Sequence, residues 1–350
     1  MKYILFTDSD KEEIRTFSEG IESLADNNCT IYVARSDYGQ KNKFINLLRY
    51  IKYFFAPFIF FTKRYKCDIL LGWQQFYALN LVFFCRLFHT KKRYKIVALN
   101  FTYKRKKGLL GTIYHKYMKY CINNDYLDLM HVPSFNYVEN CCKELNISPQ
   151  KFIVRGFGVP DFFEKWIHTK VDCSNYSLSI GRSNRDFDFL LTAWNKIEID
   201  NHQLIIISDT YKPKQKLPNN VVLKNDIIGE EQFPWIANAE LVIIPIKDGT
   251  ICSGDTVLLN SMMLKKTTVV TTPSTLQEMY IQNGYNGIAI EKDPVVFSRQ
   301  VSELLINNEK REKIGKQARE SFLKNFSRFA MGQFFAQVCA KNFNQQYDDK

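Results

Sequence analysis

Two series of short apolar segments, each separated by stretches of helical periodicity, are the feature that most constrains how this chain can fold. The first series comprises residues 2–8, 29–35, 67–73 and 95–101, and the second comprises 176–182, 202–209, 220–225, 239–245 and 267–272. Alternation of apolar strands with helices is typical of an open parallel sheet covered by helices on both faces. The sequence therefore predicts an α/β protein with two Rossmann-like sheets.

The break between the two series lies near residues 156–166, GFGVPDFFEKW, where two glycines and a proline cluster. Such a cluster is typical of an interdomain linker, and 350 residues are too many for one compact core. We predict a first domain of residues 1–160, a second of residues 161–328, and a terminal segment, 329–350, that crosses back to the first domain. Ligands are expected in a cleft between the two sheets, beyond the carboxyl ends of the strands.

Positive charge is concentrated in one region of the first half. Residues 41–120 hold 18 lysines and arginines but a single acid, Asp68, whereas the other 270 residues hold 30 basic and 35 acidic side chains. A negatively charged partner is therefore implied, which would be a phospholipid surface, a nucleic acid or a phosphorylated substrate.

The stretch KFINLLRYIKYFFAPFIFFTKRYK, residues 43–66, lies inside this region. Its apolar part is interrupted by Lys52, Pro57 and Lys63, whereas a membrane span needs ~20 apolar residues in succession. Helical spacing predicts one apolar face, with Arg49 and Tyr53 on the opposite side. That face comprises Phe44, Leu47, Leu48, Ile51, Phe54, Phe55 and Phe58. Basic flanks beside an aromatic face are typical of a helix that lies in a lipid interface.

Further basic residues follow in YKRKKGLLGTIYHKYMKY, residues 103–120. Clusters of lysine and arginine attract anionic headgroups at ~1 kcal/mol each. We therefore predict an anionic membrane surface as a partner, although a core-facing helix and a solvated basic face, or a site for a phosphorylated acceptor, are alternatives. The predicted interface residues are Phe54, Phe55, Phe58, Lys104, Arg105, Lys106 and Lys107. No nucleic-acid module is recognisable, so a nucleic-acid-binding protein is a weaker interpretation.

The second half contains four motifs in a fixed order. They are FIVRGFGVPDFF (152–163), SIGRSNRDFDFLLTAW (179–194), WIANAELVIIPIKDGTICSGDTVLLNSMMLKKTTVVTT (235–272) and TLQEMYIQNGYNGIAI (275–290). Together they resemble the linker and donor domain of GT-B glycosyltransferases, especially the GT4-like group. The resemblance covers about residues 150–325, and the first half fits by architecture alone.

The resemblance implies a metal-independent, hexosyltransferase-type enzyme that moves a sugar from a nucleotide diphosphate sugar to a hydroxyl of a glycan acceptor. No cofactor or metal is expected. Negative charge grows on the departing diphosphate, so fixed cations and helix-start amides should face it. In the second half, residues that follow the first strand and residues at the start of a helix suit this role. The resemblance adds residues expected to lie near the nucleobase and the ribose of the donor. The first group is Arg182, Arg185, Ser253, Gly254, Asp255 and Thr256; the second is Asp226, Ile227 and Asn260.

Surface arginines and an ordinary helix cap at Ser253 or Asp255 are the alternatives for the first group. The sequence also departs from the GT4-like pattern, which places glutamates at positions here occupied by Cys252 and Asn260. A catalytically silent, nucleotide-binding scaffold of a membrane glycan assembly is therefore the alternative function, and a sugar-nucleotide epimerase of the same fold is a minor one. Retaining and inverting chemistry both stay open. An inverting enzyme needs a carboxylate base, for which Asp8 is the candidate.

Location is predicted from the start of the chain and from the acceptor. Bacterial members of the group often build polysaccharide on a lipid diphosphate carrier, so we expect cell-surface polysaccharide synthesis at the inner face of the cell membrane. The segment MKYILFTDSDKEE lacks the length and cleavage site of a secretory signal, and the nine cysteines show no CxxC pair. These features predict a cytoplasmic, peripheral membrane protein with reduced thiols.

Overall fold

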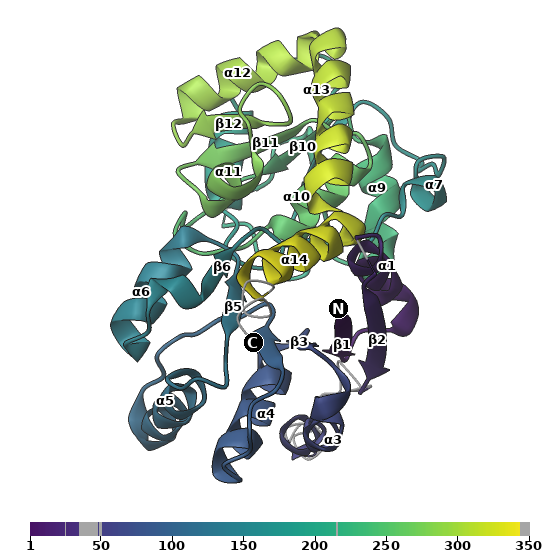
Figure 1. Cartoon of the computed structure of the whole chain (residues 1–350). Coiled ribbons are helices and arrows are strands. Elements are labelled where there is room, and N and C mark those ends of the chain that lie inside the picture. The colour runs from purple at the N-terminus through teal and green to yellow at the C-terminus, as the bar shows by residue number, and fades with distance from the viewer. Residues whose placement is uncertain (25, 35–47, 49–50, 215, 344–350) are drawn as a thin grey trace. The chain divides into compact units, whose positions relative to one another are not determined.

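The computed structural model describes residues 1–24, 26–34, 48, 51–214 and 216–343. The chain divides into two compact units (Figure 1). Unit 1 comprises Met1–Pro160 and Arg328–Lys350, of which residues 344–350 lie outside the described part, and unit 2 comprises Asp161–Ser327.

Unit 1 is built on a six-stranded sheet with the order β2-β1-β3-β4-β5-β6. Each neighbouring pair is parallel. The strands are β1 (Lys2–Thr7), β2 (Asn28–Val33), β3 (Ile69–Gly72), β4 (Lys95–Ala98), β5 (Leu129–Val132) and β6 (Phe152–Val154). The helices are α1 (Lys11–Glu22), α3 (Phe58–Lys63), α4 (Gln75–Leu87), α5 (Gly108–Ile122), α6 (Phe135–Leu145) and α14 (Arg328–Phe343), with 3-10 turns at Arg64–Lys66 and Pro149–Lys151.

The alternation of side chains along β1 separates the two cores of unit 1. Ile4 and Phe6 pack with α3, α4, α5 and α6 on one face of the sheet. Tyr3 and Leu5 pack with α1 and α14 on the other face, where these two helices lie side by side in Figure 1. Gly332 permits this approach, because a Cβ there would lie 2.0 Å from the carbonyl oxygen of Phe17. The terminal helix therefore completes the core of unit 1.

The predicted interfacial helix is interrupted in the structure. Residues 51–55 are helical, a turn follows at Ala56 and Pro57, and α3 begins at Phe58. Pro57 has no N–H to continue the helical ladder, which accounts for the break. The prediction of one helix through Phe58 is therefore wrong. Phe44, Leu47 and Arg49 lie outside the described residues.

Unit 2 is built on a second six-stranded sheet, with the order β12-β11-β10-β7-β8-β9. Its neighbouring strands are again parallel. The strands are β7 (Tyr176–Ile180), β8 (Gln203–Ile207), β9 (Val221–Lys224), β10 (Leu241–Ile244), β11 (Thr268–Thr272) and β12 (Ile288–Glu291). The helices are α7 (Phe163–Trp166), α8 (Phe187–Trp194), α9 (Gln232–Asn238), α10 (Asp255–Met263), α11 (Thr275–Tyr280), α12 (Pro294–Ile306) and α13 (Asn308–Ser321), with a 3-10 turn at Gly229–Glu231 and a π-helix at Phe322–Phe326.

The predicted α/β class and the two parallel sheets are confirmed. One face of the second sheet packs on α8 and α12 through a core that includes Leu190, Ile206, Ile243 and Phe297. No helix among the described residues is long and apolar enough to span a bilayer. All nine cysteines lie in the described part of the chain and are free thiols.

Candidate donor and acceptor sites

The site in unit 2 lies where the strand order changes direction. From β7 the chain proceeds to β8 and β9 on one side, and from β10 to β11 and β12 on the other. The loops that leave β7 and β10 therefore diverge at the carboxyl edge of the sheet, which is where open α/β sheets bind ligands. Residues 181–186 form the first loop and residues 245–254 form the second.

Asn184 links these two loops. Its Nδ2 donates to the carbonyl oxygen of Asp248 and to Ser253 Oγ, both at 2.9 Å, and its Oδ1 accepts a 2.9 Å hydrogen bond from the Asp248 amide. Asn184 adopts a φ of 54°, a conformation that asparagine tolerates better than most residues. Sequence reasoning missed this residue, and its one signal was an asparagine in a loop directly after a strand.

Arg182 is the exposed cation of the first loop. Its guanidinium pairs with Asp209, which follows β8, through Nε–Oδ1 and Nη2–Oδ2 distances of 2.8 Å. The side chain is 72% exposed, so a phosphate can reach it, and the planar fork suits phosphate oxygens as well as it suits a carboxylate. Asp209 orients the arginine and would share it with a bound anion.

Arg185 occupies a different environment from the one predicted. It is half-buried, and its guanidinium donates to the carbonyl oxygens of Ile180 at 3.0 Å and Ser183 at 3.3 Å. Burial lowers its pKa to about 10, which leaves the cation charged at neutral pH. Nη2 lies 3.1 Å from where a Cβ on Gly254 would be. The Arg185 side chain therefore lies against residues of both loops. Its contact with a diphosphate stays a prediction.

The start of α10 provides backbone amides. Gly254 is the N-cap at a φ of 96°, which only glycine adopts without strain, and no side chain caps the helix there. The capping role that we considered for Ser253 or Asp255 is therefore wrong. The first-turn amides of α10 have no carbonyl partner within the helix, and together with the helix dipole they favour an anion, which at Asp255 is its own carboxylate.

The Asp255 side chain is not suited to bind an anion. It is half-buried, and Tyr280 donates a 2.8 Å hydrogen bond to its Oδ1. Burial raises the Asp255 pKa, and the hydrogen bond from Tyr280 and the charge of Arg185 oppose that rise. The Asp255 amide also donates to this carboxylate, so Thr256 is the predicted residue whose first-turn amide is suited to an external anion. Tyr280 was not identified from the sequence.

The remaining predicted donor residues lie on neighbouring elements of unit 2. Asp226 is exposed and Ile227 half-buried in the loop after β9, at the same edge of the sheet as the β7 and β10 loops. Asn260 is half-buried in α10, and Cys252 is half-buried in the loop before it. Their contacts with a nucleoside stay predictions.

Asp8 lies at the corresponding position of unit 1. It follows β1, next to the point where the strand order reverses between β1 and β3. It is 6% exposed, and the Tyr53 hydroxyl donates a 2.6 Å hydrogen bond to its Oδ2. Tyr53 is half-buried against the core, whereas Ile51 and Phe55 of the predicted apolar face are exposed, which agrees with Tyr53 on the opposite side of the helix. Asp10, not Asp8, caps α1.

An exposed face of unit 1 combines apolar and basic side chains. Phe55 and Phe58 are 59% and 43% exposed, whereas Phe54 is half-buried with its ring 5.5 Å from that of Phe83. At the start of α5, Leu109 and Leu110 are 78% and 82% exposed. They directly follow the exposed basic residues Lys104, Arg105, Lys106 and Lys107. We call the exposed residues Phe55, Phe58, Leu109 and Leu110, together with residues 104–107, the basic apolar face.

Among the described residues, no group of three or more His, Cys, Asp or Glu side chains could hold a metal ion. The diphosphate candidates are instead an arginine and main-chain amides.

Comparisons with known proteins show which protein family and which solved structures this chain resembles. Residues 175–307 match the family model described as Glycosyl transferases group 1, which spans both loops and α10. No curated protein matches the sequence of this chain.

Solved structures resemble the chain along nearly its whole length. A glycosyltransferase from Rickettsia africae has a TM-score of 0.64 at 14% identity, with 97% of this chain and 98% of that chain covered. Anabaena HepE in complex with UDP-glucose has a TM-score of 0.58 at 12% identity, with 97% and 99% covered. The lipopolysaccharide outer core galactosyltransferase WaaB has a TM-score of 0.60 at 14% identity, with 97% and 100% covered.

Fold and sequence thus define a GT-B protein. More particularly, residues 175–307 are similar to the glycosyl transferases group 1 family, and the chain has the fold of the glycosyltransferases that it resembles.

Proposed function

We propose that this protein transfers a sugar from a nucleotide diphosphate sugar to a hydroxyl of a lipid-linked glycan, without a metal, at the inner face of a bacterial cell membrane. The resulting glycan would belong to a cell-surface polysaccharide. The observation that carries the proposal is that the loop with Arg182 and the loop that leads into α10 leave the neighbouring strands β7 and β10 at the strand-order reversal of unit 2.

The donor part of the proposal rests on charge. As the glycosidic bond breaks, negative charge develops on the diphosphate, and preorganised cations and amides stabilise it without reorganisation. Arg182 supplies the cation, and the hydrogen bonds of Asn184 fix the loop that leads to the amides. A similar fold in HepE holds UDP-glucose, which supports a uridine nucleotide as the first donor to test.

The acceptor part of the proposal rests on the basic apolar face. Exposed leucines beside a run of four cations have both properties that bind a peripheral protein to anionic lipid, buried apolar area and electrostatic attraction. A lipid-linked acceptor would be presented at that surface. The likeness to WaaB, a lipopolysaccharide galactosyltransferase, supports an acceptor of this class.

Slow hydrolysis of the donor tests the enzyme directly. The purified protein is incubated with UDP-glucose, UDP-galactose and the corresponding GDP sugars, and release of the nucleoside diphosphate is measured with and without a lipid-linked glycan. We expect release with one base, accelerated by the acceptor. The control is a variant, Arg182→Ala, which should release the diphosphate more slowly.

A catalytically silent scaffold is the second candidate. Cys252 and Asn260 stand where GT4-like proteins carry glutamates, and neither can provide a carboxylate. Tight nucleotide binding without turnover, in the presence of an authentic acceptor, would favour this scaffold over the enzyme.

A further inference from the structure

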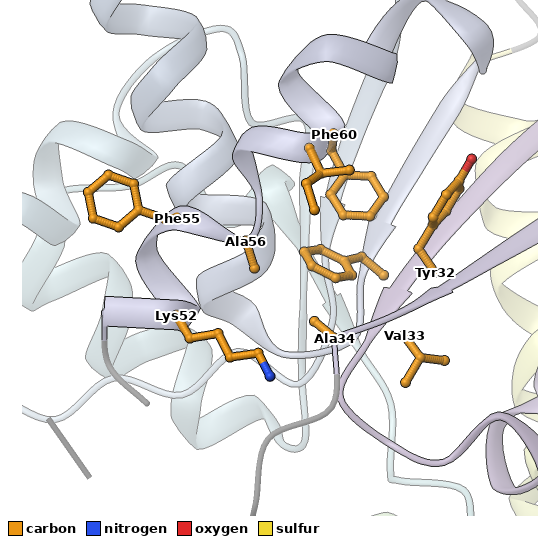
Figure 2. Close-up of a pocket in the computed structure, with 9 residues that line it drawn as sticks. Tyr32, Val33, Ala34, Lys52, Phe55, Ala56 and Phe60 are labelled. Atoms are coloured by element: carbon orange, nitrogen blue, oxygen red, sulfur yellow. The ribbon is translucent and has the colours of Figure 1, made fainter. Parts of the chain in front are cut away.

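A pocket of about 490 Å³ lies in unit 1 beside the carboxyl ends of β1 and β2 (Figure 2). This volume is within the range of small-molecule sites. Eight of its nine lining residues are apolar or aromatic, and the ninth is Lys52. The lining residues are Phe6, Tyr32, Val33, Ala34, Lys52, Phe55, Ala56, Ile59 and Phe60.

The inner wall of the pocket is fixed by aromatic packing. Phe6 and Phe60 are 2% and 1% exposed, and their ring centroids lie 3.9 Å apart. Tyr32 meets Phe60 edge to face at 5.2 Å. The pocket therefore does not have to be opened by moving these rings. A hydrocarbon chain entering it would be stabilised by each methylene group that is removed from water.

The outer rim of the pocket joins the basic apolar face. Phe55 and Ile59 line the pocket and are 59% and 53% exposed, and Phe58 lies next to Ile59 at the start of α3. An apolar chain that leaves a lipid surface bound to this face could pass over these side chains into the pocket.

Two lysine side chains lie beside the apolar walls of the pocket. The Lys52 side chain runs along one side of the pocket in Figure 2. The Lys63 ammonium lies 4.5 Å from the ring centroid of Tyr32, on the wall. A neutral chain would use neither charge, whereas a chain attached to a phosphate would use both apolar and cationic groups.

Residues that line the pocket are close in the chain to Asp8, the candidate base, and to its hydrogen-bond partner. Phe6 lines the pocket two residues before Asp8, and Tyr53, which donates to Asp8 Oδ2, follows Lys52 directly. A headgroup phosphate near Lys52 would therefore lie in the neighbourhood of the one carboxylate that we predict to activate an acceptor hydroxyl.

We propose that this pocket binds the apolar chain of the lipid-linked acceptor next to its phosphate, with Lys52 contacting that phosphate. The inference rests on the proposed function and specifies the acceptor as a lipid phosphate. It also gives unit 1 a ligand pocket whose rim is continuous with the predicted docking surface for the membrane.

Soluble probes separate the pocket from the surface. Decyl phosphate, decanol and inorganic phosphate are titrated calorimetrically into the full chain, below the concentration at which the amphiphiles aggregate. We expect decyl phosphate to bind at least tenfold more tightly than decanol, and inorganic phosphate to bind at least 100-fold more weakly than decyl phosphate. Lys52→Ala should reduce decyl phosphate affinity to that of decanol and leave decanol binding unchanged.

Substitutions that fill the pocket with a larger side chain provide a second test. Ala56→Trp should weaken decyl phosphate binding at least tenfold, whereas Ile306→Trp, on an exposed residue of unit 2, should not change it. Ala34→Leu repeats the test if circular dichroism shows that Ala56→Trp is unfolded. Equal binding to the wild type and to a folded pocket variant would overturn the proposal, as would binding of inorganic phosphate with the affinity of decyl phosphate.

The same samples are titrated with UDP, GDP, CDP and ADP. Nucleotide binding by a wild type that does not bind decyl phosphate would reject the pocket and leave the donor site in place. Pocket-dependent binding of decyl phosphate with no nucleotide binding would reject the donor site and support the pocket.

Discussion

Asn184 Nδ2 lies 2.9 Å from Ser253 Oγ, and this hydrogen bond joins two loops whose residues are 69 positions apart in the chain. The loops leave the adjacent strands β7 and β10, and backbone hydrogen bonds from Asp186 to Pro245 and from Lys247 to Asn184 also join them, so the Asn184 side chain adds to an existing link. The donor site that we propose therefore depends on a side chain that would not itself have to touch the sugar.

Replacement of Asn184 by alanine should weaken binding of the preferred nucleoside diphosphate about tenfold, which corresponds to about 1.4 kcal/mol. The variant loses three hydrogen bonds to the second loop and strains a residue at a φ of 54°. Calorimetric titration measures the affinity. Asn201→Ala is the matched control, because Asn201 has the same φ in an exposed turn. An equal loss of affinity in both variants would show that strain, not the link, matters.

Tyr280→Phe should destabilise the protein by about 1–2 kcal/mol at pH 8 and by less at pH 5. Burial raises the Asp255 pKa, so the native state binds a proton more readily than the unfolded chain. Native stability contributed by this group therefore increases as pH falls from the raised pKa toward its ordinary value. The lost hydrogen bond stabilised the carboxylate, so its absence matters most at high pH. Chemical denaturation at both pH values provides the measurement.

Tyr211→Phe is the control for this experiment. Tyr211 donates to Asp188 at 2.8 Å, but the pKa of Asp188 is lowered, first by its hydrogen bond from Lys214. That carboxylate contributes stability above its ordinary pKa and loses it only as pH falls below that value. The effect of Tyr211→Phe should thus be the same at pH 5 and pH 8. A larger effect of Tyr280→Phe at pH 5 than at pH 8 would refute the assignment.

His131 should make the free energy of unfolding fall as pH decreases from about 6.5 to about 4. The ring is buried, Nδ1 accepts the Asn100 amide at 3.2 Å, and Nε2 lies 2.9 Å from the Arg155 carbonyl oxygen. Burial lowers its pKa to about 4, so in this window the unfolded chain binds a proton that the native state excludes. The loss amounts to at most about 3 kcal/mol.

His131→Gln should remove this part of the pH dependence, measured by urea denaturation at pH 4.5, 5.5 and 7. His168→Gln, at an exposed residue of unit 2, should keep the slope of the wild type. Identical slopes in all three proteins would mean that His131 is not excluded from protonation in the native state.

Leu109→Ser combined with Leu110→Ser should release the protein from anionic vesicles, with at least a tenfold loss of binding in sedimentation. The two leucines are 78% and 82% exposed, so their replacement should leave the fold intact. Ile306→Ser, at a residue that is also 78% exposed, is the control in unit 2 and should bind as the wild type does. Retention on RNA but not on vesicles would instead favour a nucleic-acid partner.

The fold could be predicted from the sequence because most strands are apolar runs that stand apart from their neighbours. The segments at residues 2–8 and 203–207 are of this kind, and each lies inside its sheet with a strand on both sides. The strand β6 has only three residues, and β5 contains a histidine, so neither has the length or composition of an apolar run. In the structure, each of these segments is a strand because it pairs with a neighbouring strand in the sheet, and this pairing cannot be predicted from the segment's own sequence.

The candidate site was predictable only in part. Arg182 directly follows Gly181 at the end of a strand, and its exposure agrees with the position expected of a ligand-binding cation. Asn184 and Tyr280 were missed because their functions depend on hydrogen bonds to residues distant in sequence. Periodicity placed Tyr53 opposite the apolar face of its helix but could not predict its partner, because the contact with Asp8 is tertiary.

The affinity of Arg182→Ala for UDP, GDP, CDP and ADP tests the central claim most directly, compared with wild type and with Arg299→Ala, an exposed arginine of α12. We predict that the wild type and Arg299→Ala bind one nucleoside diphosphate with equal affinity and that Arg182→Ala binds it at least tenfold more weakly. Equal affinity of all three proteins, or no binding of any nucleotide by the wild type, would contradict a diphosphate site at the β7 and β10 loops.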